Sequence, residues 1–248
     1  MKHWSFKTNV GFVVFDIWGD YAHFRKYYTT SSPLTFSIPP RTALIGLIGA
    51  ILGLEKDEYL AQMTKDKCDV AIRILTPVKK VRMGQNLLNT KDGYWTPIAR
   101  SGHEPRTQLQ FEYLKDPKFR VYFGCKDSVI KENLLAKLSK HKSIYTPSLG
   151  LSELLANFSF IEESKVNEIL IDTDFLEIKT ILPIDIINNL EIIQPGRKFF
   201  KERIPTEMLP GRVVTEYREV IYEAEGQPIK AKLRSALVLE NNDVITPL

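Results

Sequence analysis

The chain has 248 residues, of which 44% are hydrophobic and 26% are charged, which fits a globular protein with a buried core and excludes a disordered or collagen-like chain. Its net charge of +4 is too small for a histone-like tail and is compatible with an acidic partner or with simple solubility. The amino-terminal residues MKHWSFKTN contain no apolar signal segment, so the sequence predicts a cytoplasmic protein without a membrane anchor.

The first two predicted elements are a strand over residues 10–18 and an apolar helix. The strand is rich in β-branched and aromatic residues, and Pro39 and Pro40 stand where a helix begins without losing a hydrogen bond. Residues 43–54 are twelve positions without a polar side chain, which is too short for a membrane span of roughly 20 residues and predicts a buried core helix. Small side chains on one side of it predict close approach to a sheet or, alternatively, a dimer seam. These small residues are Ala43, Gly46, Ala50 and Gly53.

The next predicted elements complete a first region that ends near residue 170. In chain order they are a polar helix or turn over 55–67, a strand over 68–75, an irregular stretch over 78–105, strands over 107–114 and 118–124, a helix capped by Asp127 or Ser128, and short strands over 144–146 and 158–161. With the first two elements, the order is strand, helix, strand, strand, helix, strand with an inserted arm. That order is typical of a ferredoxin-like or RNA-recognition-motif fold.

From about residue 172 the sequence predicts only strands and turns, because Pro-Gly and Gly-Gln-Pro steps interrupt it repeatedly. Residues 212–222 are a long β run rich in valine, tyrosine and threonine. Residues 229–239 alternate apolar side chains with Lys230, Lys232 and Arg234, which we interpret as a solvated strand face or a protected edge.

The two cysteines, Cys68 and Cys125, lie far apart in the sequence and form no CxxC pair. Both fall in strand-like runs. We therefore expect them to be buried, small hydrophobic residues of a protein from a reducing compartment, and the sequence indicates no zinc site.

Residues 21–28 combine aromatic rings with cations, next to the single acid Asp20. Stacking faces beside cations are typical of surfaces that bind single-stranded nucleic acid. We predict phosphate contacts for Arg25 and Lys26, and for Arg41 at the helix start, where free N–H groups attract anions. Tyr27 is a predicted RNA contact too, although Tyr27 and its neighbour Tyr28 also suit core positions of an extended segment.

The arm over residues 79–106 is a second predicted RNA surface. It contains six cations and two acids, together with glycines that allow sharp bends. A loop of this length inside a compact domain is usually functional or disordered, and its aromatic residues argue against disorder. The alternative is a solvated hairpin with incidental lysines. The predicted RNA contacts on the arm are Lys79, Lys80, Arg82, Tyr94, Trp95, Arg100 and Arg106.

A third basic run, RKFFKER, covers residues 197–203. Its cations and aromatic rings are compatible with nucleic-acid contact. Two adjacent phenylalanines are also typical of a strand that lies against a core or meets another subunit, and the sequence leaves this choice open.

Residues 16–54, which read DIWGDYAHFRKYYTTSSPLTFSIPPRTALIGLIGAILGL, resemble the amino-terminal signature of the Cas-five family. Members of this family are handle-binding subunits of type I CRISPR interference complexes (Cascade), and the likeness is greatest to subtype I-B. A weaker likeness is YTPSLGLSELLANF at residues 145–158, where members have a Leu-Gly turn. The resemblance implies an α+β fold with a ferredoxin-like, RRM-like (RAMP) palm over 1–170, a β-hairpin thumb inserted at about 79–106, and a smaller β-rich region over 171–248.

The same resemblance implies a non-catalytic RNA-binding subunit of a type I-B complex in antiviral defence. It would grip the 5′ handle of the CRISPR RNA (crRNA) and cap one end of the backbone filament. Its implied partners are the crRNA, the backbone and large subunits, and target DNA only within the assembled complex, with no membrane partner. No cofactor and no metal are expected. We expect Leu87, Leu88 and Ile98 to contact those subunits or to pack on the palm.

The competing hypothesis is a metal-independent endoribonuclease that processes repeat RNA, as members of subtype I-C do with tyrosine, lysine and histidine. Such a reaction needs a base with a pKa near neutrality and a cation for the phosphorane charge. The one combination that the sequence offers is His103 with Tyr27 or Tyr28 and with Lys79 or Lys80, and the spacing does not show that these residues meet. A third hypothesis is an interaction scaffold whose basic arm binds an acidic protein.

Overall fold

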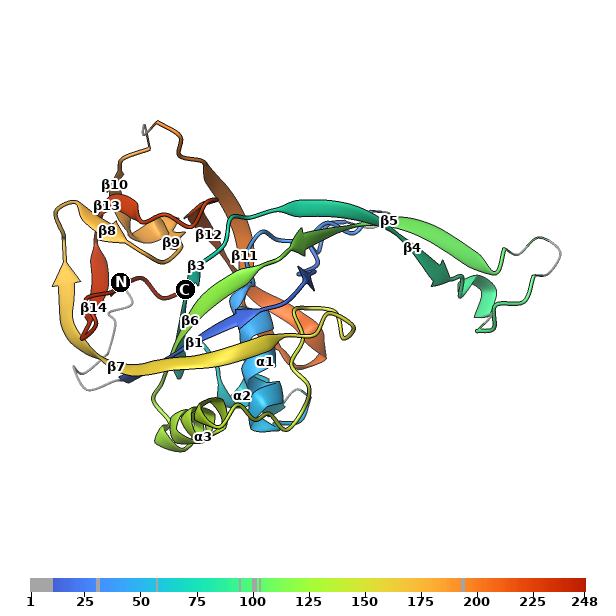
Figure 1. Ribbon diagram of the computed structural model, residues 1–248, viewed down its shortest axis with the longest axis horizontal. Coiled ribbons are helices and arrows are strands. Elements are labelled where there is room, and N and C mark those ends of the chain that lie inside the picture. The colour runs from blue at the N-terminus through green and yellow to red at the C-terminus, as the bar shows by residue number, and fades with distance from the viewer. Residues whose placement is uncertain are drawn as a thin grey trace.

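The computed structural model describes residues 11–248 apart from residues 30, 31, 57, 94, 100, 101, 103, 193 and 194. The described part is a mixed α/β structure made mostly of strands, with a long two-stranded hairpin that projects from the body (Figure 1). Its helices are α1 (Arg41–Leu52), α2 (Glu58–Gln62) and α3 (Ser128–Ser139). None of the helices in these residues is both long and apolar enough to cross a bilayer.

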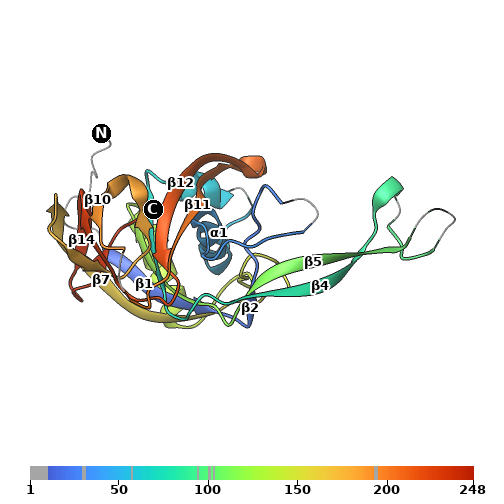
Figure 2. The same cartoon turned by 90° about the horizontal axis from the view of Figure 1, so that it is seen from above.

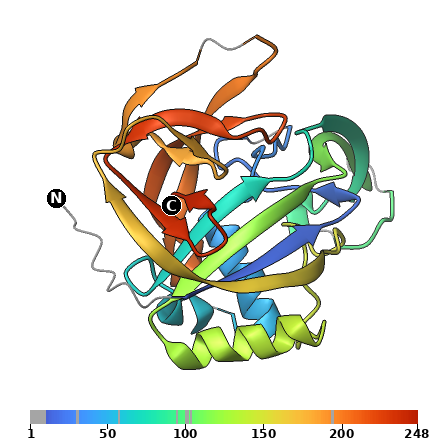
Figure 3. The ribbon, with the colours of Figure 1, turned by 60° about the vertical axis from the view of Figure 1, so that its left-hand side comes forward.

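Six antiparallel strands form the central sheet in the order β15-β14-β7-β1-β6-β3. They are β1 (Gly11–Trp18), β3 (Cys68–Ile74), β6 (Lys118–Cys125), β7 (Asn157–Ile171), β14 (Ser235–Leu239) and β15 (Val244–Ile245). In chain order β1, α1, β3, β6, α3 and β7 follow the predicted sequence of strand, helix, strand, strand, helix, strand. Helices α1 and α3 lie along one face of the sheet (Figure 3).

Both faces of β1 are buried, which explains why its sequence is apolar throughout instead of alternating. Val13, Phe15 and Ile17 face the helices in the main core. Phe12 and Val14 face a second cluster, to which β14 and β15 contribute. The carboxy-terminal strands therefore complete the core on the side of the sheet that the helices leave open.

Helix α1 begins after Pro40 and ends at Gly53, which has a left-handed φ of 83°. Its glycines lie against α2: a Cβ on Gly49 would be 3.0 Å from the Cβ of Tyr59, and one on Gly46 would be 3.6 Å from the Tyr59 hydroxyl. Of the predicted small residues, Gly46 makes room for an aromatic side chain of the next helix and not for a sheet, and a Cβ on Gly53 would lie 2.8 Å from Ile144. The large apolar residues of α1 lie in the main core.

The projecting hairpin consists of β4 (Lys80–Leu88) and β5 (Arg106–Lys115), paired from Lys80 opposite Leu114 to Leu88 opposite Arg106. The short strand β2 (Tyr21–Ala22) pairs with the base of β5, and η1 (Lys91–Gly93) lies near the tip. The prediction of an irregular stretch over residues 78–105 is thus wrong for β4. Gly84, Gln85 and Asn86 in the middle of β4 interrupt the alternation of apolar and polar residues on which strand prediction depends.

The rest of the carboxy-terminal region is strands and turns, as predicted. One small sheet has the order β10-β13-β8 and another the order β11-β12-β9. The single predicted run 229–239 is two strands in different sheets, and residues 144–146 are not a strand. The elements are β8 (Leu176–Ile178), β9 (Leu182–Pro183), η2 (Ile184–Ile186), β10 (Ile187–Leu190), β11 (Phe199–Leu209), η3 (Pro210–Arg212), β12 (Val213–Glu223) and β13 (Ile229–Leu233).

Cys68 and Cys125 lie opposite each other on the neighbouring strands β3 and β6, and a disulfide joins them. Both are buried, in agreement with the sequence prediction. The expectation of two separate thiols is corrected, because sequence spacing does not reveal that β3 and β6 pair in this register.

The Leu-Gly turn at residues 149–150 packs directly on the backbone of the loop after β2. The His23 N–H donates to the Leu149 carbonyl at 3.0 Å. Gly150 has a φ of +102°, and a Cβ there would lie 2.0 Å from the His23 carbonyl oxygen. The two segments that carry the sequence resemblance are therefore fitted to each other, backbone against backbone, in a contact that admits only glycine.

We expect Gly150→Ala to lower the free energy of unfolding by more than about 3 kcal/mol, because it adds a backbone clash to left-handed strain. Gly211→Ala is the matched control, since Gly211 has a φ of +79° and nothing lies within 4 Å of its Cβ position. That variant should lose only about 1–2 kcal/mol. Urea denaturation measures both, and equal losses would contradict the proposed clash.

Candidate nucleic-acid interface

The loop over residues 23–36 connects β2 to α1 and doubles back on itself. The Phe36 N–H donates to the Phe24 carbonyl at 2.8 Å, and the Lys26 N–H donates to the Leu34 carbonyl at 2.9 Å. The loop lies between the β11–β12 hairpin and the base of the β4–β5 hairpin (Figure 2). The loop therefore adjoins two other predicted RNA surfaces, the basic run of β11 and the β4–β5 hairpin.

Lys26 is used inside the protein. Its Nζ donates to Glu202 Oε1 at 2.9 Å and lies 5.5 Å from the centre of the Phe36 ring. Burial lowers the pKa of Lys26, but the hydrogen bond and charge of Glu202 outweigh it, so the pKa is raised. Glu202 also accepts from the Ser37 N–H at 3.0 Å. Lys26 thus attaches the loop to β11, and its charge is already compensated.

Arg41 is only 1% exposed and does not reach the surface. Its guanidinium donates to the carbonyls of Thr206, Met63 and Cys68 at 3.1, 3.0 and 2.9 Å. Burial lowers its pKa, which the charge of Glu207, 3.8 Å away, opposes. The prediction that Arg41 binds a phosphate is corrected here, because all three partners are internal backbone carbonyls.

Arg25, Tyr27 and Tyr28 lie on the surface of the loop. Tyr27 is 55% and Tyr28 60% exposed, so the alternative reading of these tyrosines as core residues is wrong. The Arg25 guanidinium donates to the Thr29 carbonyl at 3.2 Å. The Tyr27 ring contacts Tyr217 of β12, a residue for which the sequence analysis assigned no role, because a strand pattern does not show which loop its side chains meet.

The predicted cations of the β4–β5 hairpin occupy one face of it. Lys80 and Arg82 are alternate residues of β4, and Arg106 lies opposite Leu88 in the same alternation. Lys80 Nζ contacts Glu112 Oε1 and donates to the Thr35 carbonyl, both at 3.0 Å. Arg82 and Arg106 are exposed and have no carboxylate partner among the described residues. This face is turned toward the loop that contains Thr35.

Toward the tip of the hairpin, Trp95 is 74% exposed. A large aromatic ring in this position is available for stacking. The predicted contacts Tyr94 and Arg100, and the histidine of the catalytic alternative, His103, lie outside the described residues. The predicted subunit contacts Leu87 and Ile98 are 40% and 56% exposed.

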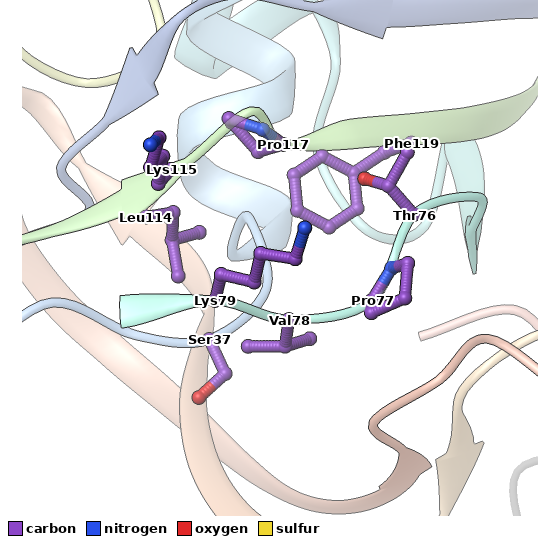
Figure 4. A pocket seen from close by; sticks show the side chains of 9 residues that line it. All are labelled: Ser37, Thr76, Pro77, Val78, Lys79, Leu114, Lys115, Pro117 and Phe119. Carbon is purple, nitrogen blue, oxygen red and sulfur yellow. The ribbon is translucent and has the colours of Figure 1, made fainter. Parts of the chain in front are cut away.

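A small pocket lies at the base of the hairpin, where two exposed lysines stand beside an apolar floor (Figure 4). Lys79 extends along this pocket toward the ring of Phe119 (Figure 4). The lining residues are Ser37, Thr76, Pro77, Val78, Lys79, Leu114, Lys115, Pro117 and Phe119. Lys79 thus lies where the hairpin leaves the body, next to the first residue of β4.

The catalytic combination stays a prediction, because His103 lies outside the described residues. Tyr27 contacts Tyr28 and Tyr217, whereas Lys80 contacts Thr35 and Glu112. His23 is 1% exposed, with Nδ1 2.7 Å from the Glu112 carbonyl oxygen and its ring beside Phe111 and Tyr113. No group of three or more potential metal ligands occurs in this part of the chain.

The run at residues 197–203 divides between core and surface. Phe199 packs against the third hydrophobic cluster, while Phe200 is 50% exposed and stacks on Tyr222. Adjacent side chains on a strand point to opposite sides, so one phenylalanine lies against the core, as the alternative to nucleic-acid contact expected. Arg203 is exposed, and its guanidinium lies 4.9 Å from the centre of the Tyr217 ring.

Comparison with solved structures finds chains of similar fold among CRISPR-associated proteins. A crystal structure of a CRISPR protein from Archaeoglobus fulgidus aligns with a TM-score of 0.54 and 13% identity, covering 96% of this chain and 100% of that one. A chain of a CRISPR RNA-guided surveillance complex aligns with a TM-score of 0.52 and 12% identity, covering 88% and 91%. At these identities the likeness concerns the fold.

The family follows from the sequence. The family model described as CRISPR-associated protein (Cas_Cas5) matches residues 12–169. The protein belongs to the Cas-five family of CRISPR-associated proteins, as the resemblance indicated. Among curated proteins, none matches the sequence.

We expect Arg41→Lys to lower the free energy of unfolding by about 3 kcal/mol, because a single ammonium cannot reach three carbonyls and leaves buried acceptors unpaired. Arg25→Lys is the matched control at an exposed site and should change it by less than about 0.5 kcal/mol. Urea denaturation at neutral pH measures both. A stability loss for Arg41→Lys no larger than that of the control would contradict the structural role.

Stability should fall with acidification because of His23. Burial lowers the pKa of His23 below its ordinary value of 6.5, so the folded protein binds this proton less readily than the unfolded chain. The contribution of neutral His23 to the free energy of unfolding is fully present above pH 6.5. It is lost as the pH falls toward the folded-state pKa, by at most about 1.4 kcal/mol per pH unit. When the pH falls from 7 to 5.5, the free energy of unfolding should decrease less for His23→Asn than for the wild type, as urea denaturation at the two pH values would show.

Proposed function

We propose that the protein is a non-catalytic RNA-binding subunit of a type I CRISPR interference complex, in which it grips the 5′ handle of the crRNA. The observation that carries this proposal is the projecting hairpin, which presents Arg82 and Arg106 without carboxylate partners among the described residues and Trp95 at 74% exposure. Free cations beside exposed rings are the chemistry that single-stranded RNA requires. The loop that contains Arg25 and Tyr27 is bonded to this hairpin through Lys80 and the Thr35 carbonyl.

In this proposal the body is a ferredoxin-like, RAMP-type palm. The order β7-β1-β6-β3 within the central sheet, together with the chain order strand, helix, strand, strand, helix, strand, supports that topology. The β4–β5 hairpin is then the thumb, inserted between the second and third palm strands, and the region from residue 171 is the carboxy-terminal addition.

The proposed assembly is of subtype I-B, and the protein would cap one end of its backbone filament. The likeness of residues 16–54 to subtype I-B members supports the subtype. Exposed Leu87 on β4 and exposed Ile98 near the tip of the hairpin support contact with backbone and large subunits, since apolar side chains gain from burial at an interface. Target DNA would be met only in the complex, where guide pairing reads its sequence.

RNA binding by the full-length protein should depend on salt through the hairpin. On an end-labelled repeat RNA that contains the handle, removing two phosphate contacts with Arg82→Ala/Arg106→Ala should reduce the slope of log K against log salt by about 1.4. Lys140→Ala/Lys142→Ala removes the same charge from exposed positions beyond α3 and should leave the slope unchanged. Equal slopes for wild type and both variants would contradict the grip by the hairpin.

The same RNA incubated with protein and EDTA tests the enzymatic alternative. Intact RNA that shifts on a native gel supports a clasp. Cleavage at a fixed site 5′ of the handle would instead make the protein the processing endoribonuclease. The scaffold hypothesis predicts no shift and an assembly that survives nuclease treatment.

A further inference from the structure

We propose that Tyr27, Tyr28 and Tyr217, with Arg203, form a platform on which unpaired bases of RNA stack, so that the β11–β12 hairpin is a second part of the RNA site. This inference rests on the proposed function and extends it beyond residues 12–169, the part that the family model matches. It adds three residues to the site, of which Tyr217 and Arg203 come from the carboxy-terminal region.

The ring of Tyr27 contacts two other tyrosine rings, one on its own loop and one on the distant strand β12. The ring centres of Tyr27 and Tyr28 are 5.1 Å apart, and the two rings are perpendicular. Those of Tyr27 and Tyr217 are 4.9 Å apart at 49°, and the Arg203 guanidinium lies 4.9 Å from the Tyr217 ring centre. The tyrosines and the arginine thus form a continuous aromatic and cationic surface.

The exposure of these rings indicates a binding role instead of a structural one. Tyr27 and Tyr28 are more than half exposed, and Tyr217 is partly exposed, although each would be stabilised by burial. Exposed aromatic side chains that cluster at one place mark an interaction site more often than scattered ones do. An incoming planar base would cover the open ring faces.

The charge near the platform is positive because the acids around it are already paired. Glu202 binds Lys26 at 2.9 Å, Glu219 binds Lys201 at 2.9 Å, and Glu216 binds Lys65. In the described part of the chain, neither Arg203 nor Arg25 has a carboxylate partner. Both arginines therefore remain available to phosphates next to stacked bases.

The platform has rigid support on both sides. Glu202, next to Arg203 in β11, holds the loop through Lys26 and Ser37, and Arg41 holds β11 through the Thr206 carbonyl. The loop is bonded to the β4–β5 hairpin through Thr35, whose carbonyl accepts from Lys80. The rings are thus positioned before RNA binds, which lowers the entropy cost of binding, and they adjoin the hairpin that bears the other cations.

These features fit single-stranded RNA more closely than a duplex. Tyrosine rings stack on the faces of bases, and in a duplex those faces are covered by neighbouring base pairs. Stacking tolerates any base, so the platform would hold an unpaired segment without reading its sequence.

The test uses full-length protein and a handle-containing RNA in which 2-aminopurine replaces one unpaired nucleotide at a time. With wild type, the fluorescence of one or two positions should change on binding, because that base stacks on a tyrosine. Tyr217→Ala and Tyr27→Ala should abolish this change and weaken binding on the order of tenfold. Tyr217→Phe keeps the ring and should retain both, and Arg203→Gln should weaken binding with a smaller effect on stacking.

Phe175→Ala is the matched control. The Phe175 ring is 39% exposed and has two cations over it, Lys230 and Lys232 of β13, which belongs to a different sheet from β11 and β12. It should bind RNA as the wild type does. Variants whose urea midpoint stays at the wild-type value but whose binding and fluorescence are also unchanged would overturn the platform while leaving the proposed function intact. Failure of the wild type to bind the RNA would overturn both.

Discussion

The attachment of the carboxy-terminal hairpin to the palm depends on one buried guanidinium. Arg41 begins α1, and its three hydrogen bonds reach the end of α2, the start of β3 and the middle of β11. A planar group with five donors can satisfy carbonyls in several directions at once, which an ammonium cannot do. Because β11 is fixed in this way, the loop after β2 has a firm surface to lie on, and the Lys26–Glu202 pair completes the contact.

This use of charge inside the protein determines which charges remain outside. Lys26 of the loop and Arg41 of α1 make hydrogen bonds inside the protein, to Glu202 and to backbone carbonyls. Arg25 of the same loop remains at the surface. The acids of β11 and β12 are likewise engaged in ion pairs. The surface around the loop is therefore cationic although the whole chain has a net charge of only +4. The electrostatic potential at this surface depends on which charges are paired within the protein, and not on the net charge of the whole chain.

Sequence patterns predict features that depend on residues close in the chain, such as helix caps. They do not predict contacts between segments that are far apart in the chain. Asp127 caps α3 as expected, because a cap is a contact within three residues: its side chain accepts from the Val129 and Ile130 N–H groups. Arg41 looked like a phosphate ligand because the carbonyls that bury it lie 22 to 165 positions away. Tyr217 offered no local signal, since only the fold brings it to Tyr27. The order of the strands within the sheet also depends on distant contacts, which local patterns leave open.

The way the β4–β5 hairpin enters the sheet has a consequence for evolution. It is inserted between β3 and β6, which pair with each other, and the Leu75 N–H already donates to the Lys118 carbonyl at 2.9 Å where the insertion begins and ends. The palm therefore closes this connection whatever its length, and each doubling of a loop costs only about 0.6 kcal/mol. The outer part of the hairpin can therefore lengthen, shorten or change in sequence without a change in the core of the protein.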